Sequence, residues 1–254
     1  MKKICDPNRR TVLKGLSWTM GITGLGLTPL LSSCLTREAI PDQGIRTLKG
    51  TAWLDGIPLQ PGMQPKPGST ITTDVGASVT MVMGSDAFLI HEYSEVFLLP
   101  RPLAMSQVGE ARVADVQPEQ SATVTAVGTV LGYSLKRGRI LSVFSPGLRT
   151  LQTPNATIGI RGTGTYLEYQ PGRTYLCTCY GTTTIQSLQD PTARETITAQ
   201  HHDAPRFIHD VGSGKEFLEK APMINHTDDE LVMLEGLVGR RPPFDDRSGN
   251  HHSY

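Results

Sequence analysis

TPNATIGIRGT, residues 153–163, is the stretch of this sequence from which the fold class can be worked out. Two isoleucines in it are separated by a single residue, which is the two-residue period of a β-strand. Glycines let such a strand bend and pass closely over a neighbour. They occur in this stretch at Gly159 and Gly162, and again directly after it at Gly164. For Arg161 we expect a structural role, pairing with a carboxylate or with backbone carbonyls, in preference to ligand binding.

On both sides of this stretch the chain consists of short β-like runs. Residues 79–83 and 87–90 flank Gly84-Ser85-Asp86, a turn that is typical of a hairpin. Further strands are expected at residues 94–99, 123–131, 139–144, 157–160, 165–169, 174–179 and 182–185. Residues 101–121 are polar and bounded by prolines, which predicts an inserted surface loop. Because no helical period occurs before about residue 212, the fold class is mainly β.

The last part of the chain has helical features in place of the β-like runs. Residues 214–220 favour one short helical turn, and Thr227 with Glu230 fits a capping box. Leucines then recur at helical spacing until Gly239, which precedes two arginines and two prolines. This pattern predicts a short amphipathic helix that docks on the β domain, with partner binding as the alternative. Residues 245–254 are polar and are expected to be disordered.

The N-terminus has the features of an export signal. Residues 8–14, NRRTVLK, contain Arg9 and Arg10 and resemble a twin-arginine signal, followed by an apolar run interrupted by glycines and a proline. Leu31-Ser32-Ser33-Cys34 resembles a lipobox, in which Cys34 becomes the acylated first residue. The alternatives are a plain cleaved signal and an uncleaved amphipathic anchor. Leucine in place of aspartate after Cys34 favours the outer over the inner membrane, and a periplasmic location follows.

Charge argues against nucleic acid as a partner. The 24 basic and 24 acidic side chains balance, so the chain has no net field that would attract phosphates. Residues 1–33 hold five of the basic residues and one of the acidic residues, and their removal leaves 19 basic against 23 acidic. We therefore expect five parts: a signal (1–33), a linker (34–43), a β domain (44–210), a C-terminal helical segment (211–244) and a tail (245–254).

The β runs resemble the FecR domain family. The similarity begins at GTAW (50–53), LQPG (59–62) and GSTITT (68–73), and it is closest over GRILSVF (138–144) and residues 153–163. The family pattern T-P-x-A followed by R-G-T is matched by Thr153, Pro154, Ala156, Arg161, Gly162 and Thr163. This resemblance implies a twisted two-layer or solenoid-like β domain that works outside the cytoplasm.

The resemblance also sets an expectation about signalling. Well-known FecR proteins carry a cytoplasmic anti-sigma segment and a spanning helix before the periplasmic domain. Here the residues before the β domain resemble an export signal, so we expect no cytoplasmic segment. The resemblance therefore extends only to the extracytoplasmic domain of that family, and it implies a module that senses or binds a partner.

The pair Cys177 and Cys179 is the most specific chemical feature of the sequence. Residues two apart on a strand share a face, with Cα atoms ~6.6 Å apart, which is near the upper limit for a disulfide. Three interpretations stay open: two packed side chains, a strained redox-active disulfide, and a site for a soft metal such as zinc or copper. The candidates for completing a metal site are His201 or His202, together with His226.

Catalytic motifs are absent from the sequence: it contains no G-x-S-x-G, H-E-x-x-H, P-loop or dinucleotide-binding fingerprint. We therefore expect a non-enzymatic, lipid-anchored periplasmic protein whose FecR-like domain binds or senses a small ligand or an envelope protein. The alternative is a periplasmic metal-binding or thiol-redox protein centred on Cys177 and Cys179.

Overall fold

The computed structural model of the 254-residue chain describes residues 42–100, 131–210 and 212–245. The expected export signal with Arg9 and Arg10, the lipidation site Cys34, the inserted loop 101–121, almost all of the strand 123–131 and the tail after residue 245 lie outside these residues. Among the described residues, no helix has the length and apolar character needed to cross a membrane.

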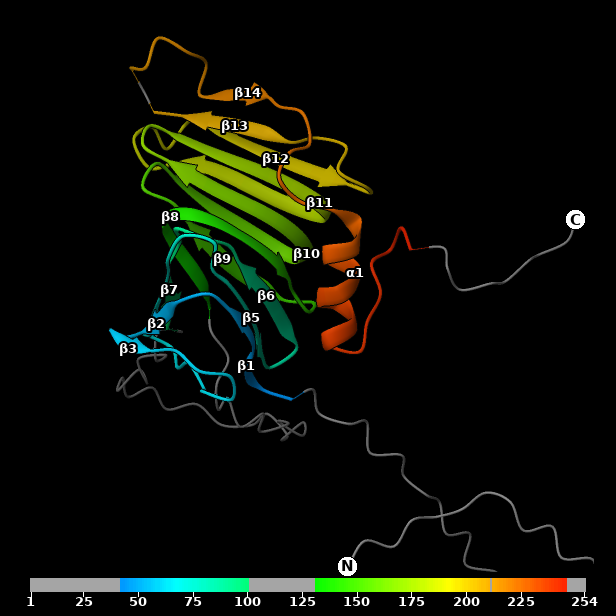
Figure 1. Ribbon diagram of the computed structural model, residues 1–254. Coiled ribbons are helices and arrows are strands. Elements are labelled where there is room, and N and C mark those ends of the chain that lie inside the picture. The colour runs from blue at the N-terminus through cyan, green and yellow to red at the C-terminus, as the bar shows by residue number, and fades with distance from the viewer. Residues whose placement is uncertain (1–41, 101–130, 211, 246–254) are drawn as a thin grey trace, which may run out of the picture. The chain divides into compact units, whose positions relative to one another are not determined.

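The described chain is mostly β-strand, with one short helix near its C-terminus (Figure 1). Fourteen strands join in one hydrogen-bonded sheet that is not closed. The strands are β1 (Gly44–Lys49), β2 (Ala52–Leu54), β3 (Ile57–Pro58), β4 (Thr70–Thr73), β5 (Ser78–Met83), β6 (Asp86–Ile90), β7 (Glu95–Leu99), β8 (Gly132–Val143), β9 (Leu148–Gln152), β10 (Ala156–Gln170), β11 (Arg173–Ser187), β12 (Arg194–Ala199), β13 (Arg206–His209) and β14 (Leu218–Lys220). The helix is α1 (Asp228–Leu237). The predicted mainly-β class with a short C-terminal helix is confirmed.

Three long strands change partners part-way along their length. The first residues of β8 lie between β7 and β9, whereas residues 140–143 lie between β6 and β10. β10 likewise pairs first with β9 and then with β8, with β11 on its other side throughout. β11 pairs with β13 through residues 173–176 and with β12 through residues 181–186. One set of strands can therefore build two regions of sheet.

Glycines mark the points where these strands bend. Gly138 in β8 has a φ of 88° and lies against Ser94, where a side chain would collide with the backbone. Gly181 in β11 has a φ of 89° and lies against Thr163 of β10. The hydrogen-bond register between β10 and β11 shifts beside it, between Arg161 and Thr165. The bending that residues 153–163 predict thus occurs at the end of that stretch.

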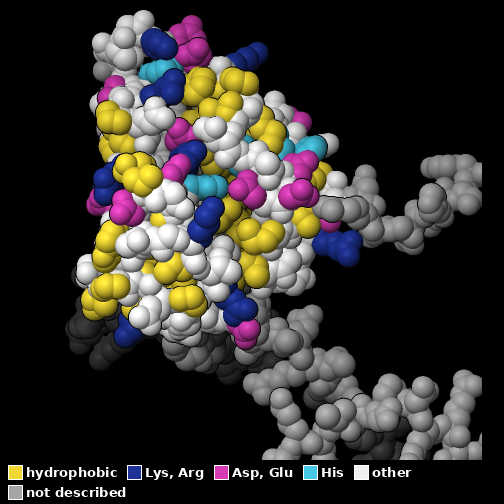
Figure 2. Space-filling model, in the orientation of Figure 1, with side chains coloured by type: hydrophobic (Ala, Val, Ile, Leu, Met, Phe, Trp, Pro, Cys, Tyr) yellow, Lys and Arg dark blue, Asp and Glu magenta, His cyan; other side chains and the backbone are white. Residues whose placement is uncertain are grey.

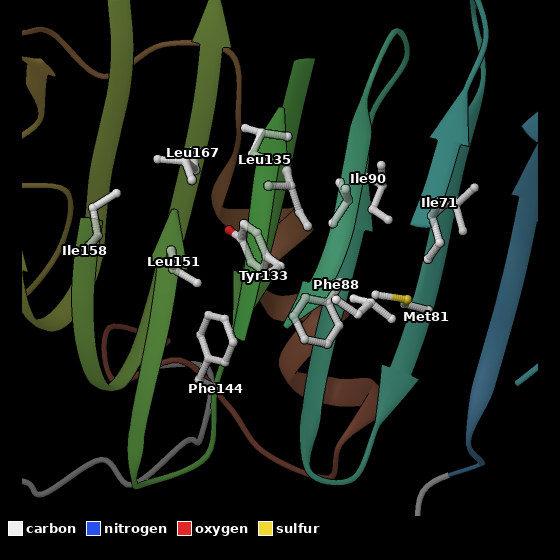
Figure 3. Packing of buried hydrophobic residues seen from close by; sticks show 14 of the residues in the cluster. Ile71, Met81, Phe88, Ile90, Tyr133, Leu135, Phe144, Leu151, Ile158 and Leu167 are labelled. Atoms are coloured by element: carbon white, nitrogen blue, oxygen red, sulfur yellow. The ribbon is translucent and has the colours of Figure 1, made fainter. Parts of the chain in front are cut away.

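The main core lies on one side of the strands. Figure 3 shows Ile71, Phe88, Tyr133, Leu151 and Ile158, which come from the five strands β4, β6, β8, β9 and β10 and point into the same apolar layer. Each of these side chains is completely buried. Burying one such side chain contributes roughly 1.5–3 kcal/mol to folding.

A second, smaller apolar cluster lies beneath α1. Leu231, Leu234 and Val238 of the helical segment pack on residues of β6, β8, β10 and β11, and Cys177 and Cys179 belong to this cluster. The predicted capping box is confirmed: the Thr227 side chain accepts from the Glu230 amide, and the Glu230 carboxylate accepts from the Thr227 amide. Near the other end of α1, Glu235 accepts hydrogen bonds from Tyr180 and Arg240.

Several sequence predictions of local structure need correction. The runs expected at 157–160 and 165–169 are one strand, β10, and those at 174–179 and 182–185 are one strand, β11, because the glycines bend these strands without ending them. Residues 218–220 form β14, which pairs with β13, and not the helical turn predicted at 214–220. Arg161 is exposed, and its side chain makes no ion pair within the described ranges. The expected carboxylate partner is therefore not present there.

Candidate metal centre

β11 presents Cys177 and Cys179 on the face that α1 covers, and neither cysteine is exposed. Their position along the strand is unusual. One edge of β11 is paired with β10. On the other edge, the pairing with β13 stops at Leu176 of β11, and the pairing with β12 starts at Gly181 of β11. The two cysteines therefore lie opposite the gap between β12 and β13.

His202 occupies this gap. It follows β12 in a turn, where its φ of 55° is left-handed, and its amide donates to the Cys179 carbonyl at 2.9 Å. Histidine is one of the few residues that adopt this conformation with some frequency, although it still carries a cost. The turn directs the imidazole back over β11, and the side chain of His202 is only 5% exposed.

His226 comes from a later segment of the chain, after β14. It lies two residues before α1 and directly follows Asn225, another left-handed residue with a φ of 61°. Its ring stacks on Tyr166 of β10, with centroids 4.5 Å apart and planes within 8°. Tyr166 is opposite Cys177 in the register of β10 and β11, so this stacking holds the imidazole next to the cysteines.

The four side chains converge on one point. Cys177 Sγ lies 3.2 Å from His202 Nδ1, Cys179 Sγ lies 3.5 Å from His226 Nε2, and the two ring nitrogens are 3.1 Å apart. All four donor atoms lie within 4.8 Å of one another. Around a tetrahedral Zn²⁺, neighbouring ligand atoms are about 3.6 Å apart for sulfur and nitrogen and about 3.3 Å apart for two nitrogens. The three short separations therefore come within about 0.4 Å of three edges of such a tetrahedron.

Both imidazoles are oriented by their outer nitrogens. Nδ1 of His226 donates to the Ile224 carbonyl at 2.7 Å, and Nε2 of His202 donates to Asp228 Oδ1 at 3.0 Å. A carbonyl or a carboxylate can only accept, so in the neutral imidazoles each inner nitrogen presents its lone pair to the cysteines. Histidines that bind metals are commonly held in this way, by a carboxylate or a backbone carbonyl behind the ring.

The electrostatics of the cluster favour one thiolate. Hydrogen bonding with the Cys179 thiol outweighs the effect of burial and, together with the neighbouring imidazoles of His202 and His226, lowers the pKa of Cys177 to about 4. Burial, followed by the hydrogen bond with Cys177, raises the pKa of Cys179 well above its usual value. Although burial opposes it, hydrogen bonding with Cys177 and Asp228 raises the pKa of His202. Metal ligation requires the thiolate and the neutral imidazole, and Cys177 already favours the thiolate form.

The structure separates the other histidines from this cluster. His201 is about half exposed, stacks on Phe244 and contacts Asp228 Oδ2 at 2.9 Å, but it does not belong to the four-residue cluster. Of the sequence candidates His201 and His202, only His202 therefore joins Cys177, Cys179 and His226. Asp228 was not a sequence candidate, because its position at the start of a helix suggested only a favourable interaction with the helix end.

The surface shown in Figure 2 carries hydrophobic, basic and acidic side chains interspersed, without one dominant charge. This agrees with the charge balance of the sequence.

No protein-family model matches the chain, and no curated protein matches it. Two crystal structures of a Parabacteroides distasonis protein described as a "putative anti-sigma factor" are similar to it, both at 7% sequence identity. Their TM-scores are 0.39 and 0.40, and each alignment covers 60% of this chain and 58% of the other. The matched region thus spans less than two thirds of either chain.

Proposed function

We propose that this protein is a zinc-binding β module in which Cys177, Cys179, His202 and His226 hold one Zn²⁺. The observation that carries the proposal is the convergence of four buried donor atoms from three separate segments within 4.8 Å. Packing of two neutral imidazoles does not account for this set, because the inner nitrogens of neutral His202 and His226 face each other as two acceptors at 3.1 Å. A cation bound between them removes this conflict.

The charge of the site favours zinc over copper. Two thiolates and two neutral imidazoles balance the charge of Zn²⁺, so the buried centre is neutral. The same ligands around Cu⁺ leave a negative charge in an apolar cluster, which is costly. Four protein ligands in tetrahedral positions are also the composition of structural zinc sites.

The burial of the cysteines favours a metal over thiol–disulfide exchange. Cysteines that exchange with a partner are accessible to it, whereas Cys177 and Cys179 are both completely covered. A closed site with four protein ligands also leaves no open position for a substrate, so we propose a non-enzymatic role.

We further propose that this module works at the cell envelope, anchored in the periplasm through Cys34, where it binds or senses a partner. The resemblance of residues 8–14 to a twin-arginine signal and of residues 31–34 to a lipobox supports this location. Mass analysis of the mature N-terminus tests the anchor, since an unacylated N-terminus would refute it.

Metal analysis of the full-length chain, purified under reducing conditions, tests the zinc site. We expect one zinc per chain, and we expect its loss in the Cys177→Ser, Cys179→Ser double variant and in His226→Gln. His209→Gln is the matched control, because His209 is also buried but bonds to Glu219 outside the cluster. Protein without stoichiometric metal, or a double variant that keeps it, would contradict the proposal.

A further inference from the structure

Helix α1 is linked to the four-residue cluster through Asp228. Asp228 is the first residue of α1, and its two carboxylate oxygens accept from His202 at 3.0 Å and from His201 at 2.9 Å. His226 lies only two residues earlier in the chain. The start of the helix is thus connected to the cluster in two ways: through His226 itself, and through the Asp228 carboxylate that accepts from His202.

The stability of α1 depends on its docking. The helix has ten residues, and an isolated helix of this length is marginal in water. Its buried residues Leu231 and Leu234 cover the same apolar cluster that contains Cys177 and Cys179. Between β14 and α1 the chain forms no regular element. The position of α1 therefore depends on contacts at its two ends and on its apolar face.

The two ends are held by different chemistry. Near the C-terminal end, Tyr180 and Arg240 bond to Glu235, and Arg240 also donates to the Ser85 carbonyl. Near the N-terminal end, Asn225 donates to Glu168 of β10 at 2.9 Å, and His226 stacks on Tyr166 and contacts Cys179. An ion bound by Cys177, Cys179 and His226 would convert the contact with Cys179 into coordinate bonds between β11 and the residue that precedes the helix.

We infer that Asp228 is a positioning residue of the metal centre and couples it to α1, so that bound Zn²⁺ holds the helix docked and loss of the ion loosens it. This inference rests on the proposed function. Coupling of this kind is reciprocal: if the ion favours the docked helix, a docked helix increases the affinity for the ion by the same factor. The apolar residues of β6 and β8 beneath α1, among them Leu89 and Val143, become accessible when the helix loosens.

Amide hydrogen exchange of the full-length protein tests the coupling. The zinc-loaded protein is compared with the same protein after the metal has been removed by a chelator. We expect exchange in residues 228–238 to rise at least about tenfold on removal, while exchange in β4 and β5 of the main core stays unchanged. If metal analysis confirms removal of the zinc and exchange in α1 does not change, the coupling is wrong although the zinc site stands. Protein that never holds zinc contradicts the proposed function instead.

Two acidic residues of the first helical turn give a matched pair of variants. Asp228→Asn should weaken zinc binding about 10–100-fold, as is typical when the group behind a ligating histidine is removed. Asp229→Asn removes the same charge from the neighbouring position and should change the affinity by less than about threefold. Equal losses in the two variants would show a general effect of charge and would overturn the role of Asp228.

A third variant separates coupling from local damage at the cluster. Leu234→Ala weakens the docking of α1 through its apolar face, six residues along the helix from Asp228. Reciprocity predicts that it also lowers zinc affinity and that added zinc restores the protection of α1 amides. An unchanged zinc affinity in a variant with increased α1 exchange would overturn the inference.

Discussion

His202 Nδ1 lies 3.1 Å from His226 Nε2, with the two rings tilted by 54°. The residues are 24 positions apart, and β13 and β14 lie between them in the chain. Because the outer nitrogens donate to Asp228 and to the Ile224 carbonyl, two lone pairs meet at this short distance. This arrangement is unfavourable for two neutral side chains and is natural for two ligands of one cation.

Zinc should stabilise the protein. A ligand that binds only the folded state adds about 4 kcal/mol when its free concentration is 1,000 times its dissociation constant. We expect thermal unfolding of metal-free protein to shift to higher temperature as zinc is added, and the Cys177→Ser, Cys179→Ser variant to show no such shift. An equal shift in that variant would place the binding elsewhere.

Two leucines of β9 report on the main core. Leu151 is fully buried and Leu148 is 66% exposed, on the same strand. Leu151→Ala should destabilise the protein by about 2–5 kcal/mol through lost burial and the cavity that remains. Leu148→Ala should stay within about 0.5 kcal/mol of the natural protein. Urea unfolding measures both, and similar losses would contradict the assignment of the core face.

Two glycines of the bent strands should respond differently to alanine. Gly181 has a φ of 89° and lies against Thr163 and the Gly162 carbonyl, so Gly181→Ala should destabilise the protein by more than about 1 kcal/mol. Gly159 has no positive φ, and its nearest neighbour, the Thr184 carbonyl, would be 4.0 Å from an added methyl. Gly159→Ala should therefore be neutral or slightly stabilising in urea unfolding. A larger loss at Gly159 than at Gly181 would contradict the bend in β11.

His91 should make stability depend on pH. Burial lowers its pKa below the usual 6.5, and Nε2 has no hydrogen-bond partner among the described residues. The charged groups that act on it are, in order of effect, Glu230, Arg139, His226 and Glu168. Because the unfolded chain binds this proton more readily, the contribution of His91 is complete above pH 6.5 and decreases as the pH falls below it.

Urea unfolding between pH 5 and pH 8 in the presence of a chelator measures this effect without a contribution from metal release. His91→Gln should flatten the decrease below pH 6.5. Identical pH profiles for the natural protein and the variant would show that other groups cause the decrease.

Local patterns in the sequence were sufficient for several elements. The turn at Gly84-Ser85 with its two strands and the capping box of Thr227 and Glu230 were predicted, because each depends on residues within a few positions of each other. β12 and β13 were not predicted as separate strands. They are short, and what defines them is their pairing with opposite halves of β11.

Sequence alone determined the mainly-β class, the short C-terminal helix and the placement of Cys177 and Cys179 on one strand face, since all three follow from the periods of two and 3.6 residues. Only the tertiary structure decided that His202 and not His201 meets the cysteines, and that Asp228 lies behind it. The physical reason is that these positions depend on a left-handed turn filling the gap between β12 and β13, and on the docking of α1. Both arise from contacts between residues about 25 to 50 positions apart, which no local period encodes.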